Sequence, residues 1–198
     1  MLTDKERDAI TEIVNIGVGK GSATLSDMID SEVLLNVPYV NLIKFDEILD
    51  EFNKMSVRDV HAVEMKFIGE YEGLANIILS SESAHTLAGI LTDSDSESDE
   101  LYEMMDGIMI EVGNIILNAV MGSFGNILEV PFDYKIPQSF KGKISDLYAS
   151  LDQEKFKQIL VCRTNFTVKD RNISGEILIM YEINSFNKLK SILNKMME

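Results

Sequence analysis

An internal repeat of secondary-structure signals is the feature that most constrains the fold of this 198-residue chain. One order of elements is predicted twice: a long helix, an extended segment, a short helix, a strand hairpin and a closing helix. In the first copy these elements are predicted over residues 2–29, 33–45, 45–55, 61–80 and 81–91. In the second copy they are predicted over residues 99–124, 126–140, 144–156, 157–183 and 184–197. Two copies of one unit predict a pseudo-two-fold domain in which both copies contribute strands to one sheet.

The predicted fold class is therefore α+β, with a mainly antiparallel sheet faced by the two long helices, because hairpins join antiparallel strands. The chain is expected to form one domain made of two repeats, residues 1–92 and 99–198. An acidic linker, residues 93–98, contains no apolar residue and joins them. At the start of the first long helix, Thr3 or Asp4 can act as the cap, and Glu6 is placed to complete a capping box.

Charge narrows the range of partners. The chain has 18 Lys and Arg against 33 Asp and Glu, a formal net charge of −15. Such a surface repels nucleic acids and anionic membranes, so neither is expected as a partner. No apolar run is expected to reach the roughly 18 residues of a membrane span. The first residues show no signal-peptide pattern, and a cytoplasmic location is expected.

The few cysteine and histidine residues indicate no metal or thiol chemistry. Cys162, the only cysteine, lies in an apolar run that reads as a strand, where a small buried side chain is expected. His61 and His85 are isolated in the sequence and are expected at the surface or half-buried, so no metal site is predicted.

The stretch EIVNIGVGKG, residues 12–21, resembles a phosphate-binding loop only superficially. A P-loop needs four residues between its glycines, Ser or Thr after the lysine, and a preceding strand. Here Gly21 follows Lys20, the spacer is absent, and the preceding residues read as helix. Gly17, Gly19 and Gly21 are instead expected to allow close approach of another helix or the sheet, or to mark a kink.

A polar pair recurs in the two long helices. Each copy has a glutamate, an asparagine three residues later, and a proline after twenty-two further residues. These residues are Glu12, Asn15 and Pro38 in the first copy and Glu111, Asn114 and Pro137 in the second. Residues three apart share one face of a helix. One such pair is ordinary for an amphipathic helix, but two pairs with identical spacing indicate a shared function.

With these motifs the chain resembles the CheC family of chemotaxis phosphatases (the CheC/CheX/FliY group), and the order of elements agrees along essentially the whole chain. The resemblance implies a CheC-like fold with two sites. It also implies hydrolysis of the aspartyl phosphate on a CheY-type response regulator, and CheD as a further partner. No cofactor is implied for this chain, because Mg²⁺ is expected on the partner receiver domain.

Carried over by residue, the resemblance assigns Glu12 and Asn15 to a first catalytic site and Glu111 and Asn114 to a second. The family often has Asp or Ser four positions before the glutamate. Asp8 matches this position in the first copy. The second copy departs from the pattern, because Gly107 stands there.

The residue types suit this chemistry. An acyl phosphate is already activated, so its hydrolysis needs little beyond a water held in line with the leaving carboxylate. A neutral carboxamide can position that water without bringing negative charge to the phosphoryl group, as the glutamine of a GTPase does. A glutamate on the same helix face could pair with a receiver lysine.

Two other readings are compatible with the sequence. The chain could be a non-catalytic binding module for CheD or a phosphorylated receiver, or an adaptor like those of the flagellar switch. A metal-dependent enzyme is disfavoured, because no regular D-x-D ligand spacing occurs. A monomer is the default expectation for an internally duplicated chain.

Overall fold

The structure is a computed structural model of the chain. It describes residues 2–48, 50, 59–69, 71–93, 99–149, 154, 156–168 and 171–196. The elements of the first half are α1 (Asp4–Ile29), β1 (Val33–Lys44), the 3-10 helix η1 (Phe45–Glu47), β2 (Asp59–Gly69), β3 (Gly73–Ser80) and α3 (Ser81–Thr92). Those of the second half are α4 (Asp99–Leu128), β4 (Phe132–Tyr134), β5 (Gln138–Lys143), α5 (Ile144–Ala149), β6 (Gln158–Val168), β7 (Arg171–Tyr181) and α6 (Ile183–Met196).

The order of elements agrees with the sequence prediction, and the differences concern their boundaries. α4 continues through residues 126–128, where an extended segment was predicted. Leu128 is buried and is the last residue of the helix, and the next residue, Glu129, has a left-handed φ of 54°. α5 ends at Ala149. The short helix predicted over 45–55 is present in part: residues 45–47 form η1, residues 48 and 50 are α-helical, and the remainder lies outside the described residues, as does most of the linker 93–98.

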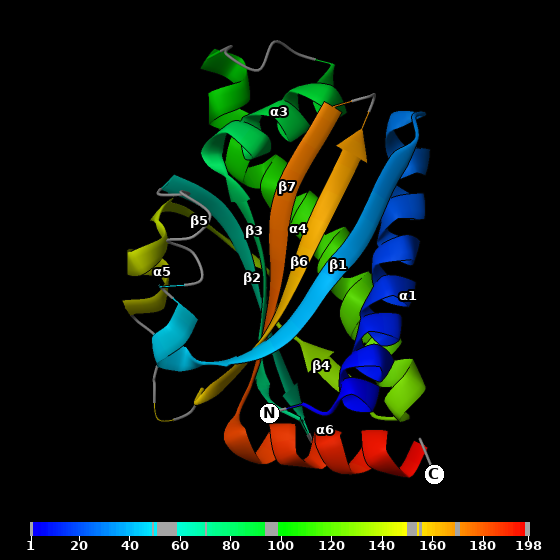
Figure 1. The fold of residues 1–198 in the computed structure, drawn as a ribbon. Helices are drawn as coiled ribbons and strands as arrows, with labels where there is room; N and C mark the ends of the chain where they lie inside the picture. The colour runs from blue at the N-terminus through cyan, green and yellow to red at the C-terminus, as the bar shows by residue number, and fades with distance from the viewer. Residues whose placement is uncertain are drawn as a thin grey trace.

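All pairings in the sheet are antiparallel, and the two halves are interleaved: the hairpin β6-β7 lies between β1 and β3, and the hairpin β3-β2 lies between β7 and β4. The strand order is β1-β6-β7-β3-β2-β4, and β5 also pairs with β2. The long helices α1 and α4 lie on one face of this sheet and α5 on the other (Figure 1). The predicted α+β class, with an antiparallel sheet faced by two long helices, is confirmed.

The strand register repeats with an offset of 99 residues. Tyr39 of β1 lies opposite Arg163 of β6. Gln138 of β5 follows Tyr39 by 99 residues. It lies opposite Glu64 of β2, which precedes Arg163 by 99 residues. The same offset separates Glu12 from Glu111, so one internal two-fold relates the pairing of the edge strands and the polar motifs. The exact repeat boundaries, 1–92 and 99–198, stay a prediction.

The two prolines of the motif lie at equivalent interruptions of this pairing. β1 shifts register between Asn36 and Tyr39, on either side of Pro38. In the second half the edge strand is broken between β4 and β5, where Pro137 lies. Proline has no N–H to donate to a ladder, so it is tolerated at an edge strand or a bulge. The prolines therefore mark sheet geometry.

Glycines let α1 and α4 pack closely as an antiparallel pair. A side chain at Gly17 would overlap the Cα atom of Val120 and approach the carbonyl oxygen of Ala119 to 2.9 Å. A side chain at Gly21 would lie 3.3 Å from the Cα atom of Ile116. A side chain at Gly19 would meet nothing within 4 Å. The close-approach interpretation is thus confirmed for Gly17 and Gly21 and wrong for Gly19.

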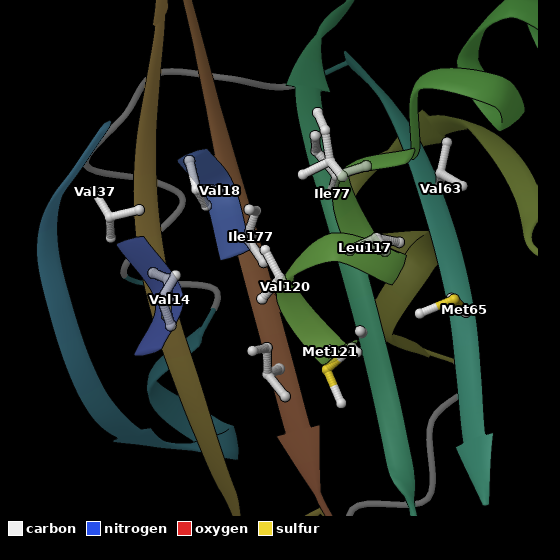
Figure 2. Packing of buried hydrophobic residues seen from close by; sticks show 14 of the residues in the cluster. Val14, Val18, Val37, Val63, Met65, Ile77, Leu117, Val120, Met121 and Ile177 are labelled. Atoms are coloured by element: carbon white, nitrogen blue, oxygen red, sulfur yellow. The ribbon is translucent and has the colours of Figure 1, made fainter. Parts of the chain in front are cut away.

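The main core lies between this helix pair and the sheet. Val14 and Val18 of α1, and Val120 and Met121 of α4, pack with inward-facing residues of the strands, among them Ile177 (Figure 2). A second core cluster lies on the opposite face, under α5 and η1. At the start of α1, Thr3 and Glu6 form the predicted capping box, and the buried Glu6 carboxylate also lies 3.3 Å from Lys190 of α6.

One helix departs from the expectation that no segment could span a membrane. Residues 101–128 of α4 are long and apolar enough by length and composition, and half of the most apolar window is buried inside the protein. α4 packs against α1 and the sheet, and it exposes Glu111 and Asn118. These contacts are those of a core helix in a folded domain. Such a helix can be as long and as apolar as a membrane-spanning helix.

The two histidines meet in the fold, which corrects the view of them as isolated. The rings of His61 (β2) and His85 (α3) are 5.4 Å apart, and the His85 ring is 4.6 Å from that of Tyr102 (α4). His61 is buried, contrary to expectation, whereas His85 is half-buried. Burial, reinforced by Lys141 and His85 and opposed by Asp106, lowers the pKa of His61 to about 4. His61 therefore stays neutral in the folded protein near pH 7.

Replacing Gly17 with alanine should destabilise the protein, because the added methyl group forces α1 away from α4. We expect a loss of about 1–3 kcal/mol in the free energy of unfolding, measured by urea denaturation. Gly19→Ala is the matched control on the same helix; it should be neutral or stabilising by up to ~1 kcal/mol. Equal effects of the two substitutions would contradict the close-contact account.

Acid should weaken the fold through His61. Its pKa in the folded protein is about 4, below the value near 6.5 of an unfolded chain. Between these values only the unfolded chain takes up the proton, so this contribution to stability is present above pH 6.5 and lost as the pH falls towards 4. Between pH 7 and pH 5 the wild type should lose about 1–2 kcal/mol more than His61→Phe, compared by urea unfolding at both pH values. An equal loss of unfolding free energy in the two proteins would refute the role of His61.

Candidate functional site

The four residues of the repeated pairs lie on the outer surface of the helix layer. Glu12 and Glu111 are exposed, and Asn15 and Asn114 are partly exposed. On each helix the residue that follows the glutamate, Ile13 or Val112, is buried. The helical period therefore directs one stripe into the core and leaves the Glu/Asn stripe outside. All four side chains can be reached from solvent.

The two pairs are separate sites on one helix pair. α1 and α4 run antiparallel, with Gly17 beside Val120 and Gly21 beside Ile116. Continuing this antiparallel alignment by two residues places Asn15 level with residue 122 of α4. Residue 122 is eight residues further along α4 than Asn114. A rise of 1.5 Å per residue places the two asparagines about 12 Å apart along the helix axis. The structure thus presents two Glu/Asn pairs related by the internal two-fold, and does not merge them into one cluster.

The second pair has a further polar neighbour. Asn118 Nδ2 donates a hydrogen bond to Asn114 Oδ1 over 2.7 Å. Asn118 lies one turn after Asn114 and is exposed. At Gly107, where the family pattern often has Asp or Ser, the surface is open, and an added side chain would meet nothing within 4 Å. The adjacent Asp106 is exposed.

An apolar groove of about 480 Å³ lies beside the second pair. It is formed where the ends of α1 and α3 meet the first half of α4, and Glu111 forms part of its wall. Its lining residues are Met28, Leu91, Thr92, Glu103, Met104, Gly107, Ile108, Glu111 and Val112. Met28 and Met104 are 53% and 56% exposed, so the groove opens apolar surface to solvent.

The surroundings of the first pair are charged. With the offset of 99 residues, Lys5 takes the place of Met104 and Asp8 that of Gly107. Both are exposed. The place of Met105, which is buried, is taken by Glu6, whose carboxylate is bound to Lys190. The two pairs therefore share a backbone scaffold and differ in the chemistry of their surroundings.

Neither a metal-binding cluster nor the cysteine contributes to the site in the part of the chain that the structure describes. Among the described residues, no three His, Cys, Asp or Glu side chains are placed to hold a metal ion. Cys162 lies in β6, fully buried, as the sequence predicts. Burial raises the pKa of its thiol far above the usual range, so it is not a thiolate near neutral pH.

Sequence reasoning located both Glu/Asn pairs and missed their neighbours. The spacing of four between Asn114 and Asn118 is a helical contact distance and could have indicated their hydrogen bond. The groove gave no such signal, because it forms only when the end of α1, with Met28, is folded against α4, which begins 71 residues later in the chain.

Comparisons with curated proteins find relatives in bacterial chemotaxis. The chain is 21% identical over 196 residues to the CheY-P phosphatase CheC of Bacillus subtilis, covering 95% of this chain and 93% of that protein. It is 26% identical over 135 residues to the flagellar motor switch phosphatase FliY of Bacillus subtilis, covering 68% of this chain and 34% of FliY. No protein-family model matches.

Solved structures share the fold. The crystal structure of FliY from Thermotoga maritima matches with a TM-score of 0.79 and 19% identity, covering 98% of both chains. The FliM middle domain from H. pylori matches with a TM-score of 0.65 and 15% identity, over 98% of this chain and 99% of that chain. CheX in its crystallised complex with CheY, BeF3 and Mg²⁺ from Borrelia burgdorferi gives 0.54 and 21%, over 87% and 99%. These matches confirm the predicted CheC-like fold.

Proposed function

The relatives and the shared fold place the chain in the CheC/CheX/FliY family, and from this premise we propose that it hydrolyses the aspartyl phosphate of a CheY-type response regulator. A relative that matches nearly the whole chain is named CheY-P phosphatase CheC, and a structural neighbour was crystallised with CheY. The single observation that carries the proposal is the pair of solvent-accessible Glu/Asn motifs, held in equivalent positions on α1 and α4. We propose a cytoplasmic protein acting in chemotaxis.

In the proposed reaction Asn15 or Asn114 positions the attacking water. The carboxamide oxygen accepts a hydrogen bond from the water, whose lone pair is then directed at phosphorus, opposite the leaving aspartate oxygen. Water adds its oxygen to the phosphoryl group, the P–O bond to the aspartate breaks, and inorganic phosphate and a free carboxylate result. A rigid helix is a suitable support, because orientation of a reactant can supply several kcal/mol of the rate enhancement.

Glu12 and Glu111 are proposed to dock the receiver. Each lies one turn before its asparagine and is exposed, so a receiver lysine beside the phosphorylated aspartate can pair with it. Such a contact would set the helix across the partner's site and bring the asparagine to the phosphoryl group. No metal is required on this chain, since Mg²⁺ is proposed to belong to the receiver.

A non-catalytic role is the second candidate, favoured by the match to the FliM middle domain. The chain would then bind a phosphorylated receiver or CheD, or act as a flagellar-switch adaptor, without turnover. The presence of both Glu/Asn pairs on the surface favours the phosphatase, because binding alone needs no water-positioning carboxamide. A monomer with two sites remains our proposal for the assembly.

Replacing both Asn15 and Asn114 with alanine should abolish the accelerated loss of phosphate. We expect kcat to fall about 100-fold or more, since the attacking water is no longer oriented. Phosphate release from a phosphorylated CheY-type receiver of the same organism is the measurement, with circular dichroism to verify folding. Asn194→Ala, an exposed asparagine on α6, is the control. Full activity in the double variant would overturn the assignment, and no activity in the wild type would favour the binding module.

Aspartate at Asn15 and Asn114 should be at least as harmful as alanine. The shape is kept, but a carboxylate brings negative charge towards the dianionic phosphoryl group and repels it. The same phosphate-release assay compares the two double variants at equal receiver concentration. A rate retained by the aspartate form would show that charge repulsion is not a factor at the site.

A further inference from the structure

The hydrogen bond between Asn118 and Asn114 distinguishes the two proposed sites. Asn118 Nδ2 donates to Asn114 Oδ1 over 2.7 Å, from one helical turn further along α4. Asn114 is partly exposed and Asn118 is exposed, so the bond forms at the surface where a receiver would dock. α4 is long and packed along its inner face, which holds the two side chains at a fixed spacing.

This contact suits a water-positioning amide. A carboxamide oxygen has two lone pairs, and its nitrogen has two hydrogens. Asn118 occupies one lone pair of Asn114 Oδ1 and leaves the other for water. It also fixes the plane of the amide, so less rotamer freedom is lost when the receiver binds. Orientation before the reaction is the kind of contribution that raises kcat rather than affinity.

The first site lacks this support. The residue one turn after Asn15 is Gly19, which precedes Asn118 by 99 residues and has no side chain. The space next to Gly19 is open, since an added Cβ would meet nothing within 4 Å. The two asparagines thus have equivalent backbone positions, and only Asn114 is held by a neighbour at the following turn.

We infer that Asn118 is a positioning residue of the second site, which orients the Asn114 carboxamide for water activation and makes that site inherently faster than an unsupported one. This inference rests on the proposed phosphatase function. Asn118 acts through Asn114 and needs no contact with the phosphoryl group.

The first test isolates the second site with Asn15→Ala and then adds Asn118→Ala. We expect kcat for phosphate release to fall about three- to tenfold with KM unchanged, the loss typical of one surface hydrogen bond. The effect should depend on Asn114: in an Asn114→Ala protein that keeps Asn15, all activity comes from the first site, and adding Asn118→Ala should leave kcat unchanged. An unchanged or raised kcat, or a change confined to KM, would overturn the inference.

The second test transfers the contact to the first site. In the Asn114→Ala background only the first site remains, and Gly19→Asn should raise its kcat about three- to tenfold. Gly19→Ala is the matched control, because it removes the glycine without supplying a donor, and alanine favours the helix more than asparagine does. Equal rates for Gly19→Asn and Gly19→Ala would contradict the positioning role.

The two tests separate this inference from the proposed function. If the Asn15→Ala/Asn114→Ala protein keeps full activity, the water-positioning mechanism fails and the inference fails with it. The other outcome is that the Asn15→Ala/Asn114→Ala protein is inactive, Asn118→Ala leaves the rate of its Asn15→Ala parent unchanged, and Gly19→Asn equals Gly19→Ala. In that case the phosphatase mechanism stands and only the role of Asn118 is refuted.

Discussion

The close packing of α1 against α4 is the constraint on which the rest of the structure depends. The helices approach so closely at Gly17 that a side chain there would overlap the backbone of Val120. This contact fixes the layer that covers the sheet and sets the register of the two Glu/Asn pairs. A wider spacing would leave the core under Val14 and Val18 incompletely filled, at the cost that voids bring to a packed interior.

The internal two-fold explains why both glycines of the close contact between α1 and α4 lie on α1. With an offset of 99 residues, Gly17 corresponds to Ile116 and Gly21 to Val120. The contact of Gly17 with Val120 is therefore the symmetry mate of the contact of Gly21 with Ile116. Each close approach needs one small residue, and α1 provides both. The second copy can carry larger residues at these positions, which the sequence alone left unexplained.

Equivalent backbones do not make equivalent sites. Around the first pair the surface carries Asp8 and Lys5, whereas an apolar groove opens beside Glu111. Asn114 is held by Asn118, and Asn15 is followed one turn later by a glycine. Side chains on the outer surface of a packed helix bear little on the core. A duplicated scaffold can thus retain its fold while its two functional surfaces diverge.

The sequence by itself determined the element order, the antiparallel class, a capping box with Glu6 at the start of α1 and the Glu/Asn stripes, because helical period and hairpin signals are local. Tertiary structure decided which strands pair across the halves, the contact of His61 with His85, and the groove beside Glu111. These features join residues far apart in the chain, and no local pattern encodes such contacts. The end of α4 was misplaced for the same reason, since burial of Leu128 continues the helix past the predicted boundary.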